Sequence, residues 1–425
     1  MINKVKKGGM GVLIKIAFRN IGRNKRRTAF CLCAVGIACF FIVIYSSLID
    51  GMTKTINEVT QIFEMGHIKI VSAQFDAEHE YMPVQYPLEL NGETNWKTIS
   101  ANIKRIPGIR EALPRITAMA TLQANAVKHA FLWGIDIQAE TRANNFNMTD
   151  RNDGLLKGRW PLPGANECAI GLVFENKSGL SIGDTIALKT ISSEFSDKYS
   201  SPKITGVFNF DFIKFDEQFI IVDIEWLQRL LVLDGGTQSL VIFAEDEKTS
   251  PFISASVQQL MGKDNVVTDW NDSYWVAMMK MVVPIYMTVF LVFITVASFL
   301  IINTVMMIIH ERIKEIGMMG SLGMTRTEIV KVFFFESVFL AVFGALAGVA
   351  IGGILTGALA NFPIRMGDLY GNTFADMPMS NAIFFQFSIG QLASAFALGV
   401  FIASLFTLIP SLRSARVEPV EALRR

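Results

Sequence analysis

Cysteine is scarce in this 425-residue chain, and its four copies are unevenly placed. Cys31, Cys33 and Cys39 fall within one apolar run, whereas Cys168 stands alone in a polar part of the sequence. A lone cysteine cannot form an intrachain disulfide, so disulfide bonds are excluded as a source of stability for that part of the chain.

Histidine is equally rare, and the pattern of a metal site is missing. His67, His79 and His129 are scattered without ligand spacing, and Cys168 has no histidine nearby. No Ser-His-Asp set can be identified, although such triads are defined in space and not along the chain. We therefore predict no catalytic residue, no metal site and no cofactor within this chain.

The sequence also contains no G-x-x-x-x-G-K-[ST] pattern. This pattern forms the backbone loop that holds nucleotide phosphates in ATPases of the Walker type. Any ATP-driven work by this protein must therefore be powered by a separate chain, which would bind the ATP and its Mg²⁺.

Charged residues make up only 18% of the chain, and they are nearly absent from four long stretches. Each stretch reaches the roughly 20 residues that a helix needs to cross a bilayer. The last is the weakest, because two glutamines interrupt it. The stretches are Ala29–Ile49, Val282–Ile309, Val332–Ala360 and Ile383–Leu412. Residues 50–281 have ordinary mixed polarity, which predicts one large domain inserted after the first span.

The basic residues predict the orientation. The residues before the first span include nine lysines and arginines between Lys4 and Arg27 and no acidic residue. Further basic residues lie in segments 311–329 and 413–425; they are Arg312, Lys314, Arg326, Arg413, Arg416, Arg424 and Arg425. Segment 361–382 has one arginine against two aspartates. Because positive charge favours the cytoplasmic side, we expect both termini and 311–329 to be cytoplasmic and the large domain to be external. A cleaved signal peptide is the competing interpretation, but the apolar core starts only near Ala29 without a small-residue cleavage site.

The segment "LIKIAFRNIGRNKRRT" precedes the first span. Leu13, Ile16, Ala17 and Ile21 recur at helical spacing, and basic residues follow another face. This pattern predicts a helix lying in the cytoplasmic membrane interface, in contact with membrane lipids. A topology signal without fixed structure is the alternative.

The inserted domain has the pattern of a mixed α/β fold. The segment 192–203 is expected to be a hairpin tip or a loop. Expected strands are 67–71, 131–137, 184–191, 219–224 and 239–245, and expected helices are 95–106, 167–179, 224–233 and 251–262.

The third apolar stretch has two further features. Gly344, Gly348 and Gly352 follow at four-residue spacing and form one small-residue stripe, which lets helix backbones approach closely in lipid. The stripe could form a dimer seam, a sliding contact or plain packing within the chain. Glu336 is the only carboxylate within the apolar stretches. An intramembrane acid is a functional candidate, but no second acid or histidine continues a proton relay, so packing or hydrogen bonding is favoured.

The segment "ERIKEIGMMGSLGMTRTEI" (311–329) separates the second and third apolar stretches. The second helix is expected to continue into it, and Gly320 and Gly323 permit a sharp stop. Thr325 and Glu328 form a T-x-x-E capping box that would start the third helix. The result would be a short, rigid, charged helical segment suited to docking a cytoplasmic partner.

These residues resemble the FtsX-like permease domain of type VII ABC transporters, the MacB and LolC/LolE group. "KEIGMMGSLGMTRTEI" and "FFFESVFLAVFGALAGVAIGG" carry the resemblance, and "RNIGRNKRRT", "GRWPLPGANECAIGLVFENKSGLSIGDTIAL" and "IPSLRSARVEPVEALR" are similar to other parts of the family. The resemblance implies a dimer of four-span subunits seated on a cytoplasmic ABC ATPase dimer. It also implies that 311–329 is the coupling helix, with these candidate contacts: Glu311, Lys314, Glu315, Gly317, Met318, Leu322, Gly323, Thr325 and Arg326.

The fold class implied is a membrane protein with four transmembrane helices and a mixed α/β periplasmic domain between spans 1 and 2. The resemblance places it in the bacterial inner membrane as a mechanotransmitting permease. "WGID" (133–136) and "DWNDSYW" (269–275) favour the lipoprotein-releasing LolCDE branch, with lipoprotein and a periplasmic carrier as partners. A MacB-like exporter of peptides or drugs and an FtsX-like regulator of a cell-wall hydrolase are the alternatives. The second permease could be an identical or a related chain, and no nucleic acid is expected.

The expected boundaries follow the chain in order. They are a cytoplasmic elbow helix (1–28), span 1 (29–50), the periplasmic core domain (51–280), span 2 (281–309), the coupling helix (310–329), span 3 (330–360), an external loop (361–382), span 4 (383–412) and a cytoplasmic tail (413–425).

Overall fold

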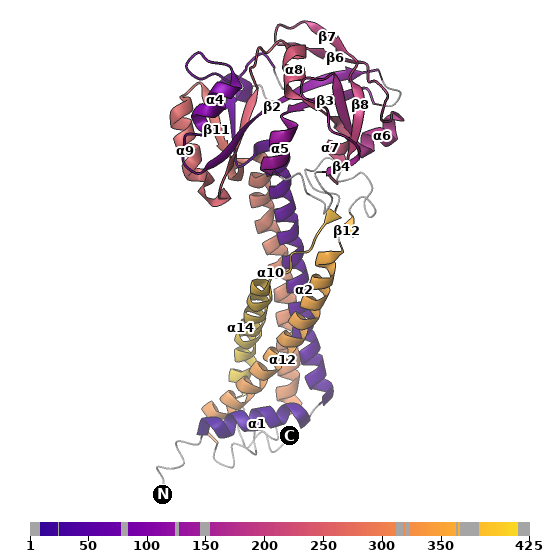
Figure 1. Cartoon of the computed structure of the whole chain (residues 1–425). Helices are drawn as coiled ribbons and strands as arrows, with labels where there is room; N and C mark the ends of the chain where they lie inside the picture. Colours follow the sequence, from indigo (N-terminus) through magenta and orange to yellow (C-terminus); the bar gives the residue numbers. More distant parts are fainter. Residues whose placement is uncertain are drawn as a thin grey trace. The chain divides into compact units, whose positions relative to one another are not determined.

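The computed structural model describes most of the chain (Figure 1). The described residues are 9–23, 25–77, 84–123, 127–144, 154–311, 318, 324–362, 364–365 and 382–414. The chain divides into a helical unit and an α/β unit. The helical unit comprises Met1–Met52, Met281–Ile364 and Phe384–Arg425, and the α/β unit comprises Thr53–Lys280 and Arg365–Ile383.

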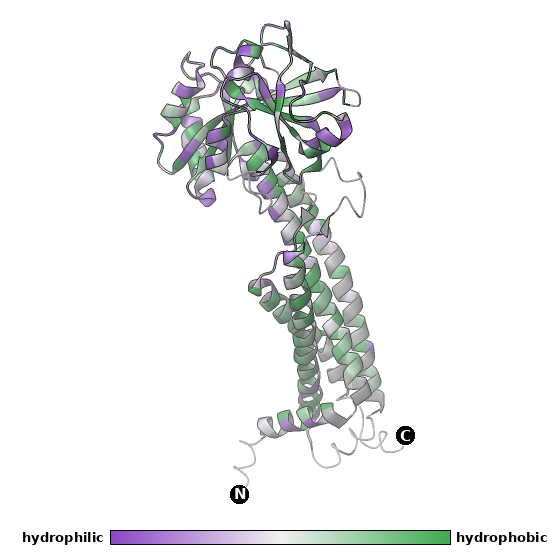
Figure 2. Ribbon diagram, turned by 45° about the vertical axis from the view of Figure 1, so that its right-hand side comes forward, coloured by the Kyte–Doolittle hydropathy of each residue, from purple (hydrophilic) through white to green (hydrophobic). Residues whose placement is uncertain are grey.

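Long helices make up the helical unit. They are α1 (Gly9–Arg23), α2 (Lys25–Val59), α10 (Tyr274–Glu311), α12 (Arg326–Asn361) and α14 (Ile389–Ser414). α2 and α10 extend past the limits of the unit, and α10 contains Pro284. A short ladder of β12 (Ile364–Arg365) and β13 (Ala382–Ile383) lies between α12 and α14 in the sequence. Figure 2 shows these helices coloured mainly as hydrophobic, in contrast to the mixed colouring of the sheet and its helices.

Three helical stretches among the described residues are long and apolar enough to cross a membrane. They are Thr28–Met65, Arg326–Asn361 and Ile389–Leu408, and they overlap the first, third and fourth predicted spans. The second predicted span lies within α10, many of whose side chains fall outside the described part. Four spans, as predicted from the sequence, therefore stay a prediction.

The α/β unit is built on one mixed sheet. Its order is β11-β1-β10-β2-β3-β9-β5-β8-β4, with β6 paired to β2 and β7 paired to β6. Pairs β3–β9 and β5–β8 are parallel, and the other pairs are antiparallel. The strands are β1 (Ile68–Ser72), β2 (Ile109–Leu122), β3 (His129–Ile135), β4 (Leu155–Gly158), β5 (Glu167–Gly171), β6 (Leu188–Ile191), β7 (Asp197–Ser200), β8 (Lys203–Phe208), β9 (Phe219–Asp223), β10 (Ser239–Ala244) and β11 (Asn265–Asp269).

Short helices cover the sheet, and a π-helix leads into it. The π-helix η2 (Thr60–Met65) follows α2 directly and ends before β1. The other elements are α3 (Ala73–Ala77), α4 (Trp96–Ile103), α5 (Ile137–Asn144), α6 (Leu172–Ser178), α7 (Ile213–Gln218), α8 (Ile224–Leu231), α9 (Ser250–Met261) and the 3-10 turns Glu247–Thr249 and Trp270–Asp272.

Apolar side chains form separate clusters within this unit. One lies under β3, β5, β8 and β9 and is covered by α6 and α8, and a second lies between β1, β10, α4 and α9. A third is rich in aromatic rings and includes Phe63, Trp133, Phe208, Phe210 and Phe215. β10 is buried at every position, as its continuous apolar run predicts for a central strand.

Most of the predicted elements of this unit are present, but one predicted helix is a mixed segment, and the strands β2, β4, β7, β8 and β11 were not predicted as strands. The helix predicted at 167–179 is instead strand β5 followed by helix α6. The change from strand to helix occurs at Gly171. Any side chain there would overlap the backbone of Asp216, so only glycine fits. The long strand β2 is not predicted, because Pro114 and Arg115 in its middle are untypical of a central strand. Pro114 is tolerated because β3 pairs with β2 only from Arg115 onward.

Candidate functional site

The glycine stripe of α12 packs against α2 of the same chain. A methyl group on Gly344 would lie 2.9 Å from Cβ of Val35, and one on Gly352 would lie 3.0 Å from Cβ of Val43. At Gly348 a methyl group would overlap the carbonyl group of Gly36, so the two backbones touch there. The three stripe glycines thus lie at an intrachain contact, where glycine is needed because nothing larger fits.

α14 completes this packing from another side. Cys39 of α2 lies close to Gly399 of α14. A methyl group on Gly399 would overlap the sulfur of Cys39. The Ser47 hydroxyl donates to the carbonyl of Gln386 at 2.7 Å, and the Gln391 amide donates to Asp50. Of the two glutamines that weaken the fourth predicted span, Gln391 is therefore bound through its side chain and Gln386 through its backbone carbonyl.

Glu336 is buried on α12, with 7% of its surface exposed. It lies among buried positions of that helix such as Phe333 and Leu340. Its neighbour Ser337 donates to the carbonyl of Phe333 at 3.0 Å. Among the described residues no cluster of three His, Cys, Asp or Glu side chains could hold a metal ion.

The start of α12 has the capping box predicted from the sequence. The Thr325 backbone N–H donates to Glu328 at 2.8 Å, and the Glu328 backbone N–H donates back to the Thr325 hydroxyl at 3.4 Å. This arrangement satisfies backbone donors that a helix start leaves unpaired. The cap fixes where α12 begins, immediately after the predicted coupling segment.

The rest of that segment is described only in part. Glu311 is the last residue of α10, Met318 is helical and 53% exposed, and Arg326 is exposed at the start of α12. The remaining candidate contacts lie outside the described residues; they are Lys314, Glu315, Gly317, Leu322 and Gly323.

The helix predicted before the first span is present as α1. Ala17 is fully buried, and the ring of Phe18 lies 5.7 Å from Phe339 and 6.4 Å from Phe343 of α12. α1 is therefore packed against the first half of α12, the helix that starts at the capping box.

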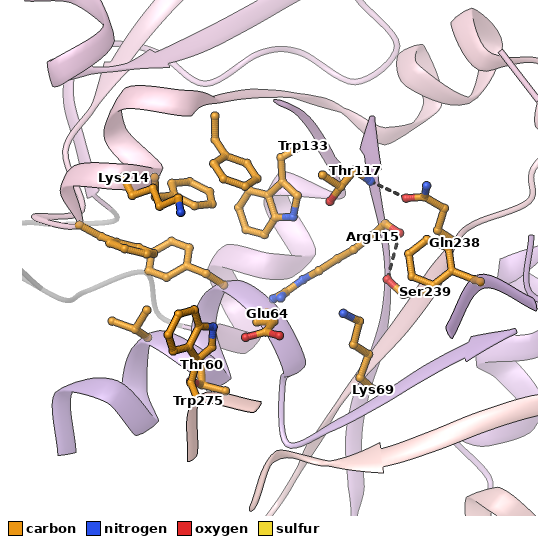
Figure 3. A pocket seen from close by; sticks show the side chains of 16 residues that line it. Thr60, Glu64, Lys69, Arg115, Thr117, Trp133, Lys214, Gln238, Ser239 and Trp275 are labelled. Atoms are coloured by element: carbon orange, nitrogen blue, oxygen red, sulfur yellow. Dashed lines mark hydrogen bonds between the residues drawn. The ribbon is translucent and has the colours of Figure 1, made fainter. Parts of the chain in front are cut away.

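Sequence analysis missed a second site, a cavity of about 340 Å³ inside the α/β unit (Figure 3). Arg115 of β2 lines this cavity, and only 3% of its surface is exposed. Nε and Nη2 of Arg115 donate to both carboxylate oxygens of Glu140 at 2.7 and 3.0 Å, and Nη2 also donates to the carbonyl of Ile62 at 2.8 Å. The guanidinium lies 5.2 Å from the ring of Trp133. The only sequence signal of this site is an arginine in the apolar run "ALPRITAMA".

Comparison with known proteins matches both units. The model of the MacB-like periplasmic core domain matches residues 28–260, and the model of the FtsX-like permease C-terminal domain matches residues 287–419. The chain is 22% identical to the lipoprotein-releasing system transmembrane protein LolC of Xylella fastidiosa, over 95% of this chain and 96% of that protein.

Two further similarities concern MacB proteins. The chain is 27% identical to the macrolide export ATP-binding/permease protein MacB of Pectobacterium atrosepticum, over 29% of this chain and 17% of that protein. The solved periplasmic region of MacB from Actinobacillus actinomycetemcomitans covers 53% of this chain and 98% of that chain, at 12% identity and a TM-score of 0.33.

Proposed function

Because the chain belongs to the FtsX-like ABC transporter permeases with a MacB-like periplasmic core domain, we propose that it releases lipoproteins from the inner membrane. It would extract them from the outer leaflet and pass them to a periplasmic carrier. The similarity to a lipoprotein-releasing protein over 95% of this chain carries the proposal, because it includes both units in one alignment. The similarity to the macrolide exporter covers less than a third of the chain.

The proposed topology has four spans with both termini in the cytoplasm. Span 2 (281–309) would be the uncharged part of α10, between the periplasmic domain (51–280) and the coupling helix (310–329). α1 would lie in the cytoplasmic interface. The lysines and arginines of the termini and of 311–329 support this orientation.

The proposed ATP-hydrolysing partner is a separate cytoplasmic ABC ATPase dimer. Its contact would be the coupling helix, of which Arg326 and the capped start of α12 are the described end. Closure of the ATPases would move α12, and the glycine contact would pass this movement to α2 because the two backbones touch at Gly36 and Gly348. A second permease copy, identical or related, would complete the transporter.

An exposed apolar tip on the periplasmic domain supports an apolar cargo or carrier. The hairpin of β6 and β7 exposes Ile191, Phe195 and Tyr199, and neighbouring Met119 of β2 is 59% exposed. Phe195 is 75% exposed and adopts a positive φ of 57°, which is unfavourable for a side chain of its size. Apolar groups gathered on a surface mark interaction sites.

The test is release of a lipoprotein from proteoliposomes that contain the permease and its ATPase. We expect release only with ATP and a carrier present. Release without ATP, or ATP-dependent export of peptides or drugs together with no lipoprotein release, would contradict the proposal and favour the MacB-like function.

The coupling role has its own test. Gly323→Pro or Glu315→Lys should abolish stimulation of the ATPase by cargo and leave membrane insertion intact. Exposed Lys263→Gln in the periplasmic domain is the matched control, since it lies in a turn of the other unit. Unchanged stimulation in both coupling variants would exclude this segment as the coupling helix.

A further inference from the structure

The cavity around Arg115 combines an aromatic wall with a charged end. Phe63, Trp133, Phe215 and Phe219 line one side, and the rings of Phe215 and Phe219 stack at 4.3 Å. Figure 3 shows Arg115, Glu64 and Lys69 directed toward the same space on the other side. A cavity of about 340 Å³ is far larger than the roughly 30 Å³ of one water molecule and lies within the range of ligand sites.

Two buried polar atoms in this cavity have no partner among the described residues. They are Nη1 of Arg115 and Oγ1 of Thr60, each shielded from bulk solvent. Buried polar groups are nearly always hydrogen-bonded, so two such atoms lining one cavity indicate a bound molecule with acceptor oxygens. Arg115 is otherwise held rigidly by Glu140 and Ile62, which leaves Nη1 as its available donor.

The charges of the cavity favour an anion. Its lining contains Lys69, Arg115 and Lys214 against the single carboxylate of Glu64. Glu140, outside the lining, neutralises Arg115, which leaves one positive charge in excess over the five groups. Burial is the main cause that lowers the pKa of Lys69, and an anion beside its ammonium would relieve that cost.

The π-helix η2 brings these groups together. Val59, Thr60, Phe63 and Glu64 all line the cavity from α2 and η2, and Trp275 lines it from the first turn of α10. π-helical turns are rare and are frequent at functional sites, because the wider turn redirects side chains.

We propose that this cavity binds an anionic amphiphile, whose carboxylate or phosphate group is held by Arg115, Lys69 and Thr60 and whose apolar chain lies on the aromatic wall. The ligand could come from a membrane lipid or from a soluble amphiphile, since both present the same anionic group beside an apolar chain. The site does not depend on the cargo of the transporter.

The test measures binding of hexyl phosphate to the full chain in phosphatidylcholine nanodiscs by calorimetry. We expect hexyl phosphate to bind more tightly than inorganic phosphate, which lacks the chain, and than hexyltrimethylammonium, which has the opposite charge. Equal binding of either comparison compound would overturn the proposal.

Variants locate the site. Lys69→Gln should raise the Kd for hexyl phosphate by about tenfold or more, because a charge-assisted hydrogen bond is lost. Thr60→Val removes Oγ1 with little change of shape and should weaken binding to a lesser degree. Exposed Lys263→Gln is the control for loss of one positive charge. An unchanged Kd in both Lys69→Gln and Thr60→Val, with folding verified by thermal unfolding, would exclude the cavity.

Nanodiscs that contain phosphatidylglycerol distinguish the two sources. If the ligand is a membrane lipid, the anionic lipid should compete and weaken binding of hexyl phosphate to the unmodified chain but not change the residual binding of Lys69→Gln. If the ligand is a soluble amphiphile, the affinity should be the same in both membranes. Either result supports an anionic amphiphile and identifies where it comes from.

Discussion

The two units of this protein use opposite means to hold their elements together. In the α/β unit, buried side chains fill clusters and form a bidentate ion pair between Arg115 and Glu140. In the helical unit, large apolar side chains such as Phe41 and Ile354 are exposed, and α2 and α12 meet where side chains are missing. Because helices in lipid lack a hydrophobic drive to associate, close backbone contact adds to the small apolar clusters of this unit, such as the one around Cys39 and Phe333.

Glycine illustrates the same difference. Gly158 at the end of β4, Gly164 and Gly179 at the end of α6 have positive φ angles between 68° and 76°. Gly36 and Gly348 lie within helices, and their lack of a side chain lets the backbones of α2 and α12 touch. A substitution at these glycines therefore acts mainly through backbone conformation in the α/β unit and through helix separation in the helical unit, whereas Gly171 of the α/β unit is required for close contact.

The largest expected effect is the loss of the buried ion pair of the α/β unit. Arg115→Met leaves the Glu140 carboxylate buried without its charge partner and should lower the free energy of unfolding of this unit by about 3–5 kcal/mol. Denaturant unfolding of the full chain followed by tryptophan fluorescence measures the change. Lys97→Met, at the exposed pair with Glu225, is the control and should cost less than about 1 kcal/mol. Equal costs in both variants would contradict the buried role.

The next effect separates the helices of the other unit. Gly348→Ala places a methyl group against the Gly36 carbonyl and should cost about 1–3 kcal/mol through forced helix separation. Thermal unfolding in nanodiscs measures the loss. Gly357→Ala on the same helix is a matched control, because its methyl group would lie 3.6 Å from Phe387 in ordinary contact. If Gly348→Ala is as well tolerated as Gly357→Ala, α2 and α12 do not depend on this contact.

A smaller effect is expected at the start of α12. Thr325→Ala removes the side chain that caps this helix and should destabilise its first turn by about 1 kcal/mol. Hydrogen exchange of the backbone amides at the start of α12 should become faster. Lys331→Gln, at an exposed position of the second turn of α12, is the control and should leave exchange nearly unchanged. A similar increase in both variants would argue against the capping box.

The smallest effect is a pH dependence of the α/β unit. Burial lowers the pKa of His67, more than the nearby Glu247 raises it, and Nδ1 of the neutral ring accepts a hydrogen bond from the Ala244 backbone N–H at 3.0 Å. Because the imidazole of His67 binds a proton more tightly in the unfolded chain, neutral His67 contributes fully to the free energy of unfolding above its ordinary pKa of about 6.5. This contribution to stability is lost as the pH falls through and below that value.

Denaturant unfolding at several pH values tests this prediction. His67→Gln should flatten the decline of stability below about pH 6.5. Exposed His129→Gln on β3 should leave the decline as it is. An identical pH profile for the unmodified chain and for His67→Gln would remove His67 as the cause.

Local patterns predicted much of the fold, and pairings distant in sequence were missed. The apolar runs at 219–224 and 239–245 predict β9 and β10, and the T-x-x-E pattern predicts the cap of α12. β2 was missed because its proline and arginine oppose a central strand, and only the pairing with β10 and β3 explains them. The cavity was missed for the same reason, since Arg115 meets Glu140 only after β2 and α5 pack together.

The unequal stiffness of the two connections to the periplasmic domain follows from their helices. At about 1.5 Å per residue, the 35 residues of α2 extend about 52 Å, well beyond the roughly 30 Å of a bilayer core. α2 contains no proline, so no residue within it lacks the backbone N–H of a regular helix. α10 contains Pro284, which removes a backbone hydrogen bond and lowers its resistance to bending. α10 is therefore expected to bend more easily than α2.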